Sequence, residues 1–303
     1  MNLREKLKSG RFVITAEITP PVSVSSDDLL AKALPLKGVA DAVNVTDGAG
    51  ARPHLGAVTA AGLLVQNGIE PILQLTCRDR NRIALQSDLL SAAALGVRNL
   101  LVLRGDDPSA GDQPDATPVF DVDTRVLLQT ARRLRDEGEL PSARRVAGSA
   151  DFFLGAADSP IDPPLGWQPK GLNAKIDAGA QFVQTQFCMD AGVVSRYMAR
   201  LAKHGITDKL AFLIGIAPLR SAKSAQWMKE KLFGTIIPDA FVARMEKAAD
   251  PVAEGQRICV ELIEELAEIR GVSGVHVMAP NNDAAVPEVI AAAREKISRL
   301  APV

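Results

Sequence analysis

The sequence is poor in aromatic residues, in histidine and in cysteine. Aromatic residues make up 4% of the 303 residues, so a core must be built mainly from aliphatic side chains and alanine. Cys77, Cys188 and Cys259 lie far apart and form no C-x-x-C pair, which argues against a disulfide framework and against a structural zinc site. Because the chain has only three histidines, a His-rich metal centre is not expected, and no metal site is predicted.

The chain also lacks an excess of charge of one sign and a long hydrophobic run. Lys and Arg total 35 against 36 Asp and Glu, a formal net charge of −1, whereas nucleic acids and anionic membranes select a concentrated basic surface. No apolar run reaches the roughly 20 residues that a membrane helix needs, and the charged N-terminal segment does not read as a secretory signal. We therefore expect a cytoplasmic protein that binds neither nucleic acid nor membranes.

Short β-rich runs alternate with longer helical patterns along the chain. Eight such units predict parallel strands joined by right-handed crossovers. Since no second domain is left over, they predict an α/β fold with a single (β/α)8 TIM barrel domain over residues 1–303. An open doubly wound sheet is the alternative, but neither G-x-G-x-x-G nor a P-loop motif follows any strand. The expected strands cover residues 12–18, 42–46, 71–76, 99–103, 145–150, 182–186, 211–216 and 275–279.

In a barrel of this kind, catalytic groups lie at the carboxyl ends of the strands and in the loops that follow them. Glu17 lies near the end of the first strand between apolar neighbours. Partial burial there would suit this carboxyl group to general acid catalysis, although an ion pair at the rim is the alternative. Asn44 and Thr46 share one face of the second strand, and Asp47 follows them. These three residues either bind a ligand or cap the turn.

Polar residues also end the third and fourth strands. Gln74 and Thr76 share one face of the third strand, where a hydrogen-bonded interior layer is the alternative to ligand binding. Arg104, Gly105 and Asp106 follow five residues of the fourth strand. Arginine can hold a phosphate or a carboxylate, glycine lets a ligand approach the backbone, and aspartate can bind the N–H groups of a heterocycle. An Arg104–Asp106 ion pair without a ligand is the competing interpretation.

The later strands carry amides and a histidine. Gln184 and Gln186 share one face of the sixth strand, where two amides either bind the edge of a flat ring or satisfy each other in the interior. Spacing alone predicts that Lys175 is a solvated helix residue and that His276 is a core or rim residue. The Asn281-Asn282 pair contacts substrate or forms a turn. Two long irregular stretches, 107–120 and 155–166, follow strands and are expected on the active face.

Taken together, eight short stretches resemble the methylenetetrahydrofolate reductase family over nearly the whole chain. Each stretch alone is weak evidence, but eight in the right order, most of them at strand ends, make a specific pattern. They are AEITPP at 16–21, VTDGA at 45–49, LTCRD at 75–79, LRGD at 103–106, PVFD at 118–121, KIDAGA at 175–180, TQF at 185–187 and GIAP at 215–218.

This resemblance implies a barrel that binds FAD non-covalently at its mouth. Hydride would pass from NADH or NADPH to the flavin and then to methylenetetrahydrofolate, or in reverse from methyltetrahydrofolate. Glu17 matches the family's general acid, which helps to open the folate ring, and Asp106 matches an aspartate that tunes the flavin and orients folate. The expected cofactor-binding residues are Thr46, Asp47, Gln74, Arg104, Gly105, Asp106, Phe120, Asp121 and Lys175, and the expected substrate-binding residues are Glu17, Gln184 and Gln186.

The chain departs from better-known members at three places. Gln74 stands where many members have histidine, the segment 151–157 replaces a Tyr-Pro-Glu stretch expected after strand five, and Ala222 replaces an aromatic residue that stacks on substrate. The first two departures motivate an alternative, a flavin-free reductase that passes hydride directly from NAD(P)H to folate.

The loop 111–121 motivates a further alternative and bears on assembly. It is similar to that of members from C1-metabolising anaerobes, some of which work with partner subunits, so the chain could be a barrel subunit of a C1-transfer complex that is inactive alone. Bacterial relatives are often homo-oligomers, and a dimer or tetramer is expected. Because the long C-terminal regulatory domain of eukaryotic members is missing, allosteric control by an adenosyl cofactor is not expected.

Overall fold

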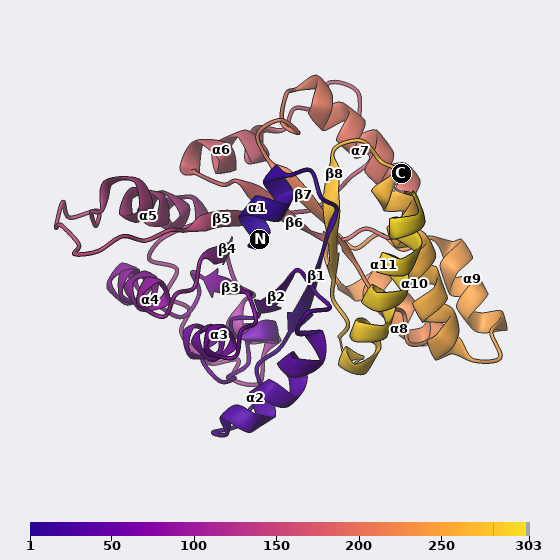
Figure 1. Cartoon of the computed structure of the whole chain (residues 1–303), viewed down its shortest axis with the longest axis horizontal. Helices are drawn as coiled ribbons and strands as arrows, with labels where there is room; N and C mark the ends of the chain where they lie inside the picture. Colours follow the sequence, from indigo (N-terminus) through magenta and orange to yellow (C-terminus); the bar gives the residue numbers. More distant parts are fainter. Residues whose placement is uncertain (281, 301–303) are drawn as a thin grey trace.

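Eight parallel strands close into a barrel in the computed structural model, which describes residues 1–280 and 282–300. Each strand pairs with the next in chain order, and β8 pairs with β1 to close the ring (Figure 1). This confirms the predicted (β/α)8 barrel. The strands are β1 Val13–Ile18, β2 Ala42–Val45, β3 Pro71–Thr76, β4 Asn99–Leu103, β5 Phe153–Asp158, β6 Phe182–Phe187, β7 Ala211–Ile216 and β8 Val272–Val277.

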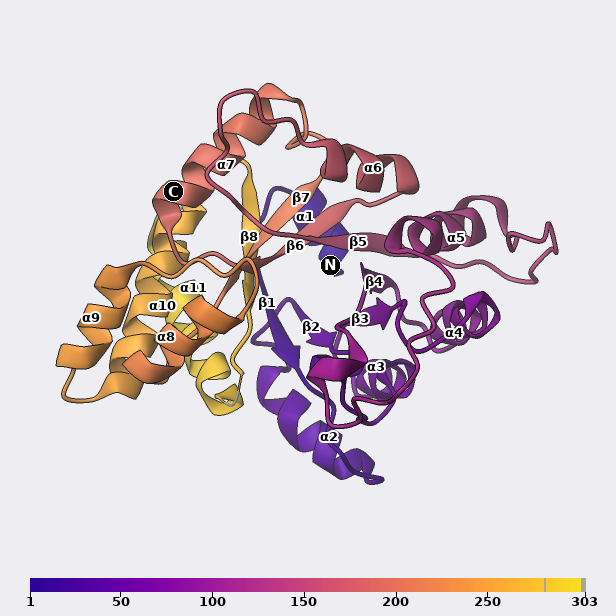
Figure 2. The same cartoon turned by 180° about the vertical axis from the view of Figure 1, so that it is seen from behind.

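Helices follow the strands and surround the barrel (Figures 1 and 2). Within the described part of the chain, none is both long enough and apolar enough to span a membrane. The α-helices are α1 Leu3–Lys8, α2 Ser26–Ala33, α3 Ala57–Gln66, α4 Arg82–Ala94, α5 Thr124–Glu137, α6 Lys170–Ala178, α7 Ala191–Lys203, α8 Ala222–Lys231, α9 Asp239–Lys247, α10 Pro251–Ala267 and α11 Val286–Leu300, with short 3-10 turns η1 Leu34–Leu36, η2 Ala49–Ala51, η3 Pro108–Ala110 and η4 Asp283–Ala285.

One end of the barrel is closed by α1. Leu3 is fully buried in a small apolar cluster that is separate from the main core between strands and helices. This cluster contains residues from the beginnings of the strands, including Val13, Phe153 and Phe182. Near the centre of the ring of strands, α1 lies in front of them in Figure 1 and behind them in the reverse view of Figure 2. A ligand must therefore enter from the other end, where the strands finish.

The predicted fifth strand is wrong. It was expected over 145–150, but β5 covers Phe153–Asp158, and the earlier segment contributes only an isolated antiparallel bridge from Arg145 to Glu139. The aromatic residue at the start of β5 fills the barrel floor, since the rings of Phe153 and Phe182 stack at 4.8 Å. Gly155 makes room for this packing, because a Cβ there would lie 2.3 Å from the Phe182 ring.

The shift of the fifth strand also corrects two expectations about the residues around it. The segment 151–157, assigned to a loop after the fifth strand, largely forms the strand itself, and the long loop that follows begins at residue 159 rather than 155. The eighth strand begins three residues before its predicted start. The remaining six strands agree with the prediction to within one residue at each end.

A buried carboxylate joins the closed end of the barrel to the surrounding helices. Asp41, just before β2, is 4% exposed and accepts hydrogen bonds from the backbone N–H of Ile14 at 2.8 Å and from Arg294 at 2.7 Å, and Lys6 lies 3.0 Å away. Burial alone would raise the pKa of Asp41, but these partners outweigh burial and lower it. The ionised form therefore stabilises contacts among α1, β1 and α11.

We predict that Asp41→Asn lowers the unfolding free energy at pH 7 by about 3 kcal/mol, which corresponds to a fall in Tm of about 5–10 °C. Because the folded pKa lies below the ordinary value near 3.9, this stabilisation is present above that value and is lost as the pH falls through the folded pKa. Circular dichroism melts should therefore show a smaller Tm difference at pH 3 than at pH 7.

A matched control is Asp162→Asn, which removes an exposed ion pair with Arg196. Exposed pairs contribute little, so the Tm of this variant should stay within about 2 °C of the wild type. Equal melting temperatures for Asp41→Asn and the wild type at pH 7 would contradict the role assigned to Asp41.

Candidate active site

A cavity of about 760 Å³ opens at the carboxyl ends of the strands. Its walls come from all the strand ends except that of β7, together with the loops after β2, β4 and α8. Ten of the twelve residues predicted from the sequence line it, and Phe120 and Asp121 do not. The ten are Glu17, Thr46, Asp47, Gln74, Arg104, Gly105, Asp106, Lys175, Gln184 and Gln186.

Phe120 and Asp121 do not line the cavity but position side chains near it. The guanidinium of Arg104 lies 4.4 Å from the centre of the Phe120 ring, a cation–π contact that limits where this arginine can point. Asp121 pairs with Arg82 at 2.7 Å, and the hydrogen bonds from Arg82 hold the pKa of Asp121 at about 2. Asp121 thus fixes the end of the loop after β4 against α4, and Phe120 fixes it against Arg104.

Glu17 is the carboxyl group of the cavity that contacts both an amide and an imidazole. Its side chain is 22% exposed, and its Oε2 accepts a hydrogen bond from Gln74 Nε2 at 2.8 Å. The same oxygen lies 3.5 Å from Nε2 of His276, which is 2% exposed. A carboxyl group held by an amide and an imidazole, with its remaining side toward the cavity, can exchange a proton with a bound ligand.

Below Glu17, a hydrogen-bonded layer of polar side chains crosses the barrel. Gln184 and Asn44 exchange two hydrogen bonds, at 2.6 and 3.0 Å, and Gln184 also donates to Thr15 Oγ1 at 3.2 Å. Thr15 Oγ1 in turn lies 3.0 Å from Nδ1 of His276. Gln184 lines the cavity, but both N–H groups of its amide are used inside the barrel. The layer therefore connects Gln184 through Thr15 and His276 to Glu17.

The ends of β2 and β4 leave groups free for a ligand. Thr46 is 5% exposed, and its buried Oγ1 has no hydrogen-bond partner among the described residues. Gly105 adopts φ +88°, and a Cβ there would lie 2.9 Å from the side chain of Arg78 and 3.1 Å from that of Thr76. The Thr46 hydroxyl is therefore a buried donor without a partner, and Gly105, where packing against Arg78 and Thr76 excludes a side chain, contributes only backbone to the cavity wall.

Lys175 is held by the end of β5. Its Nζ donates to the carbonyl of Ala157 at 2.6 Å and lies 3.6 Å from Asp158 Oδ1. Asp158 also accepts a hydrogen bond from the hydroxyl of Tyr197. Burial raises the pKa of Asp158, although Tyr197 and Lys175 oppose this effect. Lys175 is therefore a positioned cation at the cavity wall rather than a freely solvated side chain.

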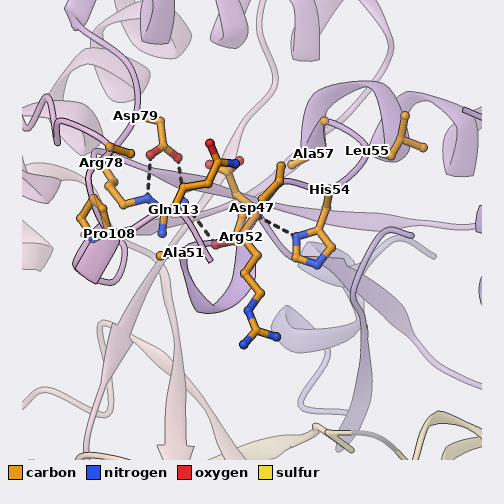
Figure 3. A pocket seen from close by; sticks show the side chains of 14 residues that line it. Asp47, Ala51, Arg52, His54, Leu55, Ala57, Arg78, Asp79, Pro108 and Gln113 are labelled. Carbon is orange, nitrogen blue, oxygen red and sulfur yellow. Dashed lines mark hydrogen bonds and ion pairs between the residues drawn. The ribbon is translucent and has the colours of Figure 1, made fainter. Parts of the chain in front are cut away.

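Asp47 has its carboxylate turned to the protein. Its Oδ2 accepts from the N–H of Thr76 at 2.8 Å and from Thr76 Oγ1 at 2.9 Å, and it pairs with Arg80. A smaller pocket of about 280 Å³ adjoins the mouth here, since Asp47, Gly48 and Arg78 line both spaces. Figure 3 shows Arg78 held by Asp79 on one side of this pocket and His54 on the other.

Three residues of the site escaped the sequence analysis. Thr15 shares a strand face with Glu17, an alternation that could have identified it. Asp158 was missed because the fifth strand was misplaced. Phe233 lies in an irregular segment after α8, where no periodic pattern indicates the barrel mouth. As for the asparagine pair, Asn282 donates to the carbonyl of Pro218 at 3.2 Å, and Asn281 lies outside the described residues.

A closed (β/α)8 barrel with a carboxyl group, amides and cations gathered at its carboxyl end has the architecture of a barrel enzyme. The sequence pattern of the family described as Methylenetetrahydrofolate reductase matches residues 2–294. The chain belongs to the methylenetetrahydrofolate reductase family.

Individual relatives are distant in sequence. A Caenorhabditis elegans protein described as a probable methylenetetrahydrofolate reductase (NADPH) is 27% identical over 239 residues, 76% of this chain but 33% of that protein. The Escherichia coli 5,10-methylenetetrahydrofolate reductase is 26% identical over 224 residues, 71% of this chain and 67% of that enzyme. The chain thus spans about a third of the nematode relative.

A solved structure of similar fold comes from Clostridium thermocellum. It is an uncharacterised protein that binds two copies of 5-methyl-5,6,7,8-tetrahydrofolic acid. The TM-score is 0.61 at 15% sequence identity, and the match covers 97% of this chain and 98% of that one. At this identity the likeness shows the shared barrel fold.

We predict that Gln184→Leu destabilises the protein by about 2–3 kcal/mol, because it removes both hydrogen-bond partners of the buried Asn44 amide and one partner of Thr15 inside the barrel. Thermal melts should show a Tm lower by several degrees. Gln186→Leu is the matched control, since Gln186 bonds to backbone groups at the rim, and it should lose less than half as much. Equal losses in the two variants would contradict the interior role of Gln184.

Proposed function

We propose that this protein is a methylenetetrahydrofolate reductase that uses FAD to move hydride between NAD(P)H and methylenetetrahydrofolate, or in reverse from methyltetrahydrofolate. The observation that carries the proposal is the position of Glu17. Its carboxyl group lies in the cavity within reach of Gln74 and His276, in a chain that belongs to this family. The family's reaction needs a proton donor at the folate ring, and Glu17 is the acid best placed for it.

The residues of the mouth fit FAD. The unpartnered hydroxyl of Thr46 and the bare backbone at Gly105 suit the polar edge of a flat ring, and the cavity volume lies in the range of cofactor sites. Arg104 and Lys175 supply positive charge for the diphosphate. Asp47, Phe120 and Asp121 would contribute indirectly, by positioning the side chains that they contact. Gln74 would lie next to the flavin. When bound, FAD supplies the hydride acceptor and donor.

The chain's own groups then handle the proton and the orientation of the substrate. Glu17, in its protonated form, would donate to the nitrogen that leaves carbon as the folate ring opens. Gln74 and His276 hold the carboxyl group in place for this transfer. Asp106, exposed at the mouth, and Gln186 would bind the N–H and C=O groups of the pterin. Gln184 would present one face of its amide to the substrate while fixing the layer beneath.

We predict that the purified protein shows a flavin absorbance spectrum that bleaches when NADH or NADPH is added without oxygen. The measurement is a visible spectrum before and after addition of each nucleotide. Thr46→Val should retain less FAD, because it loses the hydroxyl group assigned to the cofactor, whereas Thr130→Val on α5 should retain as much as the wild type. A colourless protein that binds no added FAD yet reduces folate with NAD(P)H would favour direct hydride transfer instead.

We predict that Glu17→Gln lowers folate turnover by about 10²–10⁴-fold while FAD content and flavin reduction by NAD(P)H stay near wild type. Glutamine keeps the size of the side chain and can still bond to its neighbours, but it cannot donate the acidic proton. Single-turnover absorbance separates the two half-reactions. Full folate turnover in this variant would remove Glu17 from the role of general acid.

A further inference from the structure

Phe233 stands apart from the other phenylalanines of the chain. All nine lie in the described part of the structure, and only Phe233 is exposed, at 93%. Ligand pockets are lined largely by hydrophobic and aromatic side chains, so an exposed ring at the rim of a cavity can pack against a bound ligand. Phe233 also lines the mouth of the cavity, close to Gln186. The position of this ring therefore calls for a ligand-based explanation.

The backbone around Phe233 is fixed to the end of β6. Its carbonyl accepts a hydrogen bond from Gln186 Nε2 at 3.2 Å. Three residues later, Ile236 donates to the carbonyl of Phe187 at 2.9 Å and accepts from the N–H of Met189 at 2.8 Å. These bonds join the segment after α8 to β6, so the exposed ring is carried on an anchored backbone.

The next residue keeps this segment close to the cavity wall. Gly234 adopts φ +76°, a conformation that favours glycine, and a Cβ there would lie 3.0 Å from Ser159 Oγ. Ser159 itself lines the cavity after β5. The close approach therefore brings the segment after α8 over the loop after β5, beside the ends of both strands.

The rest of the cavity offers no other ring for stacking on an outer ligand face. Among the described residues that line it, Phe233 alone carries a phenyl, phenol or indole group, and His276 is buried beneath Glu17. A pterin is flat and heteroaromatic, and such rings are held well by an aromatic side chain against one face. Its polar edge would meet Gln186, whose amide is bonded to the Phe233 carbonyl.

We infer that Phe233 is a substrate-binding residue that stacks on the outer face of the folate pterin while Gln186 binds the edge of that ring. This inference rests on the proposed function and adds to it the residue that covers the substrate. Because Gln186 bonds to the Phe233 carbonyl and not to its side chain, the ring can be removed without breaking the bond that positions Gln186.

The test is calorimetric titration of the flavin-loaded protein with 5-methyltetrahydrofolate. Phe233→Ala should raise the Kd about tenfold, and Phe233→Trp should restore binding to within about twofold of wild type, since tryptophan also stacks. Leu165→Ala is the matched control: Leu165 is fully exposed on the loop after β5 and does not line the cavity, so its removal should leave the Kd unchanged.

The outcomes separate this inference from the proposed function. If the wild type binds folate and Phe233→Ala binds it equally well, the stacking role is wrong and the reductase proposal stands. If folate affinity is unchanged but the variant needs about tenfold more NAD(P)H for flavin reduction, the ring covers nicotinamide and the folate assignment is overturned. If the wild type itself does not bind folate, the proposed function fails and the inference fails with it.

Discussion

The structure depends on a constraint that operates inside the barrel, where buried polar side chains must find their hydrogen-bond partners within the protein. Thr15, Asn44, Gln184 and His276 are each at most 3% exposed, and each has a partner within this layer. A buried amide without its hydrogen bonds is costly, so the four side chains fix one another's orientation. Glu17 contacts this layer through His276, and the interior bonding therefore fixes the geometry of the carboxyl group that we propose as the general acid.

The two ends of the barrel differ in role, since the closed end contributes to folding stability and the open end carries the proposed binding site. At the closed end, apolar side chains pack under α1, and Asp41 uses its charge entirely in structural contacts. At the open end, Thr46 Oγ1 remains unpartnered, and Asp106 and Arg104 are exposed. The buried Thr46 hydroxyl, which the protein leaves unsatisfied, raises the free energy of the unliganded state, and a ligand with a matching group would relieve this cost. The ligand binding that we propose at this end would thus follow from the same hydrogen-bonding rule that the interior obeys.

The barrel and most of its mouth could be predicted from the sequence because both depend on local alternation. Glu17, Gln74 and Gln186 end strands whose apolar residues alternate with polar ones, and the structure brings their side chains to one cavity. The contact between Glu17 and His276 could not be predicted, since it depends on the register of β1 against β8, which only barrel closure sets. The fifth strand was misplaced because its aromatic start and glycine pair with β6, a tertiary fit that strand propensity does not register.

The two ends of α8 explain how an aromatic-poor chain can still cover a flat substrate. Ala222, which the sequence resemblance predicts to stand where other family members carry an aromatic residue, begins α8 and packs partly buried against the main core. Phe233 follows the other end of the same helix, where the backbone is tied to β6 through Gln186 and Ile236. A stacking ring needs only to reach the outer face of the ligand, and in this chain Phe233 lines the cavity whereas Ala222 does not. The loss of an aromatic side chain at one end is therefore compatible with retained substrate binding when the other end presents a ring at the rim.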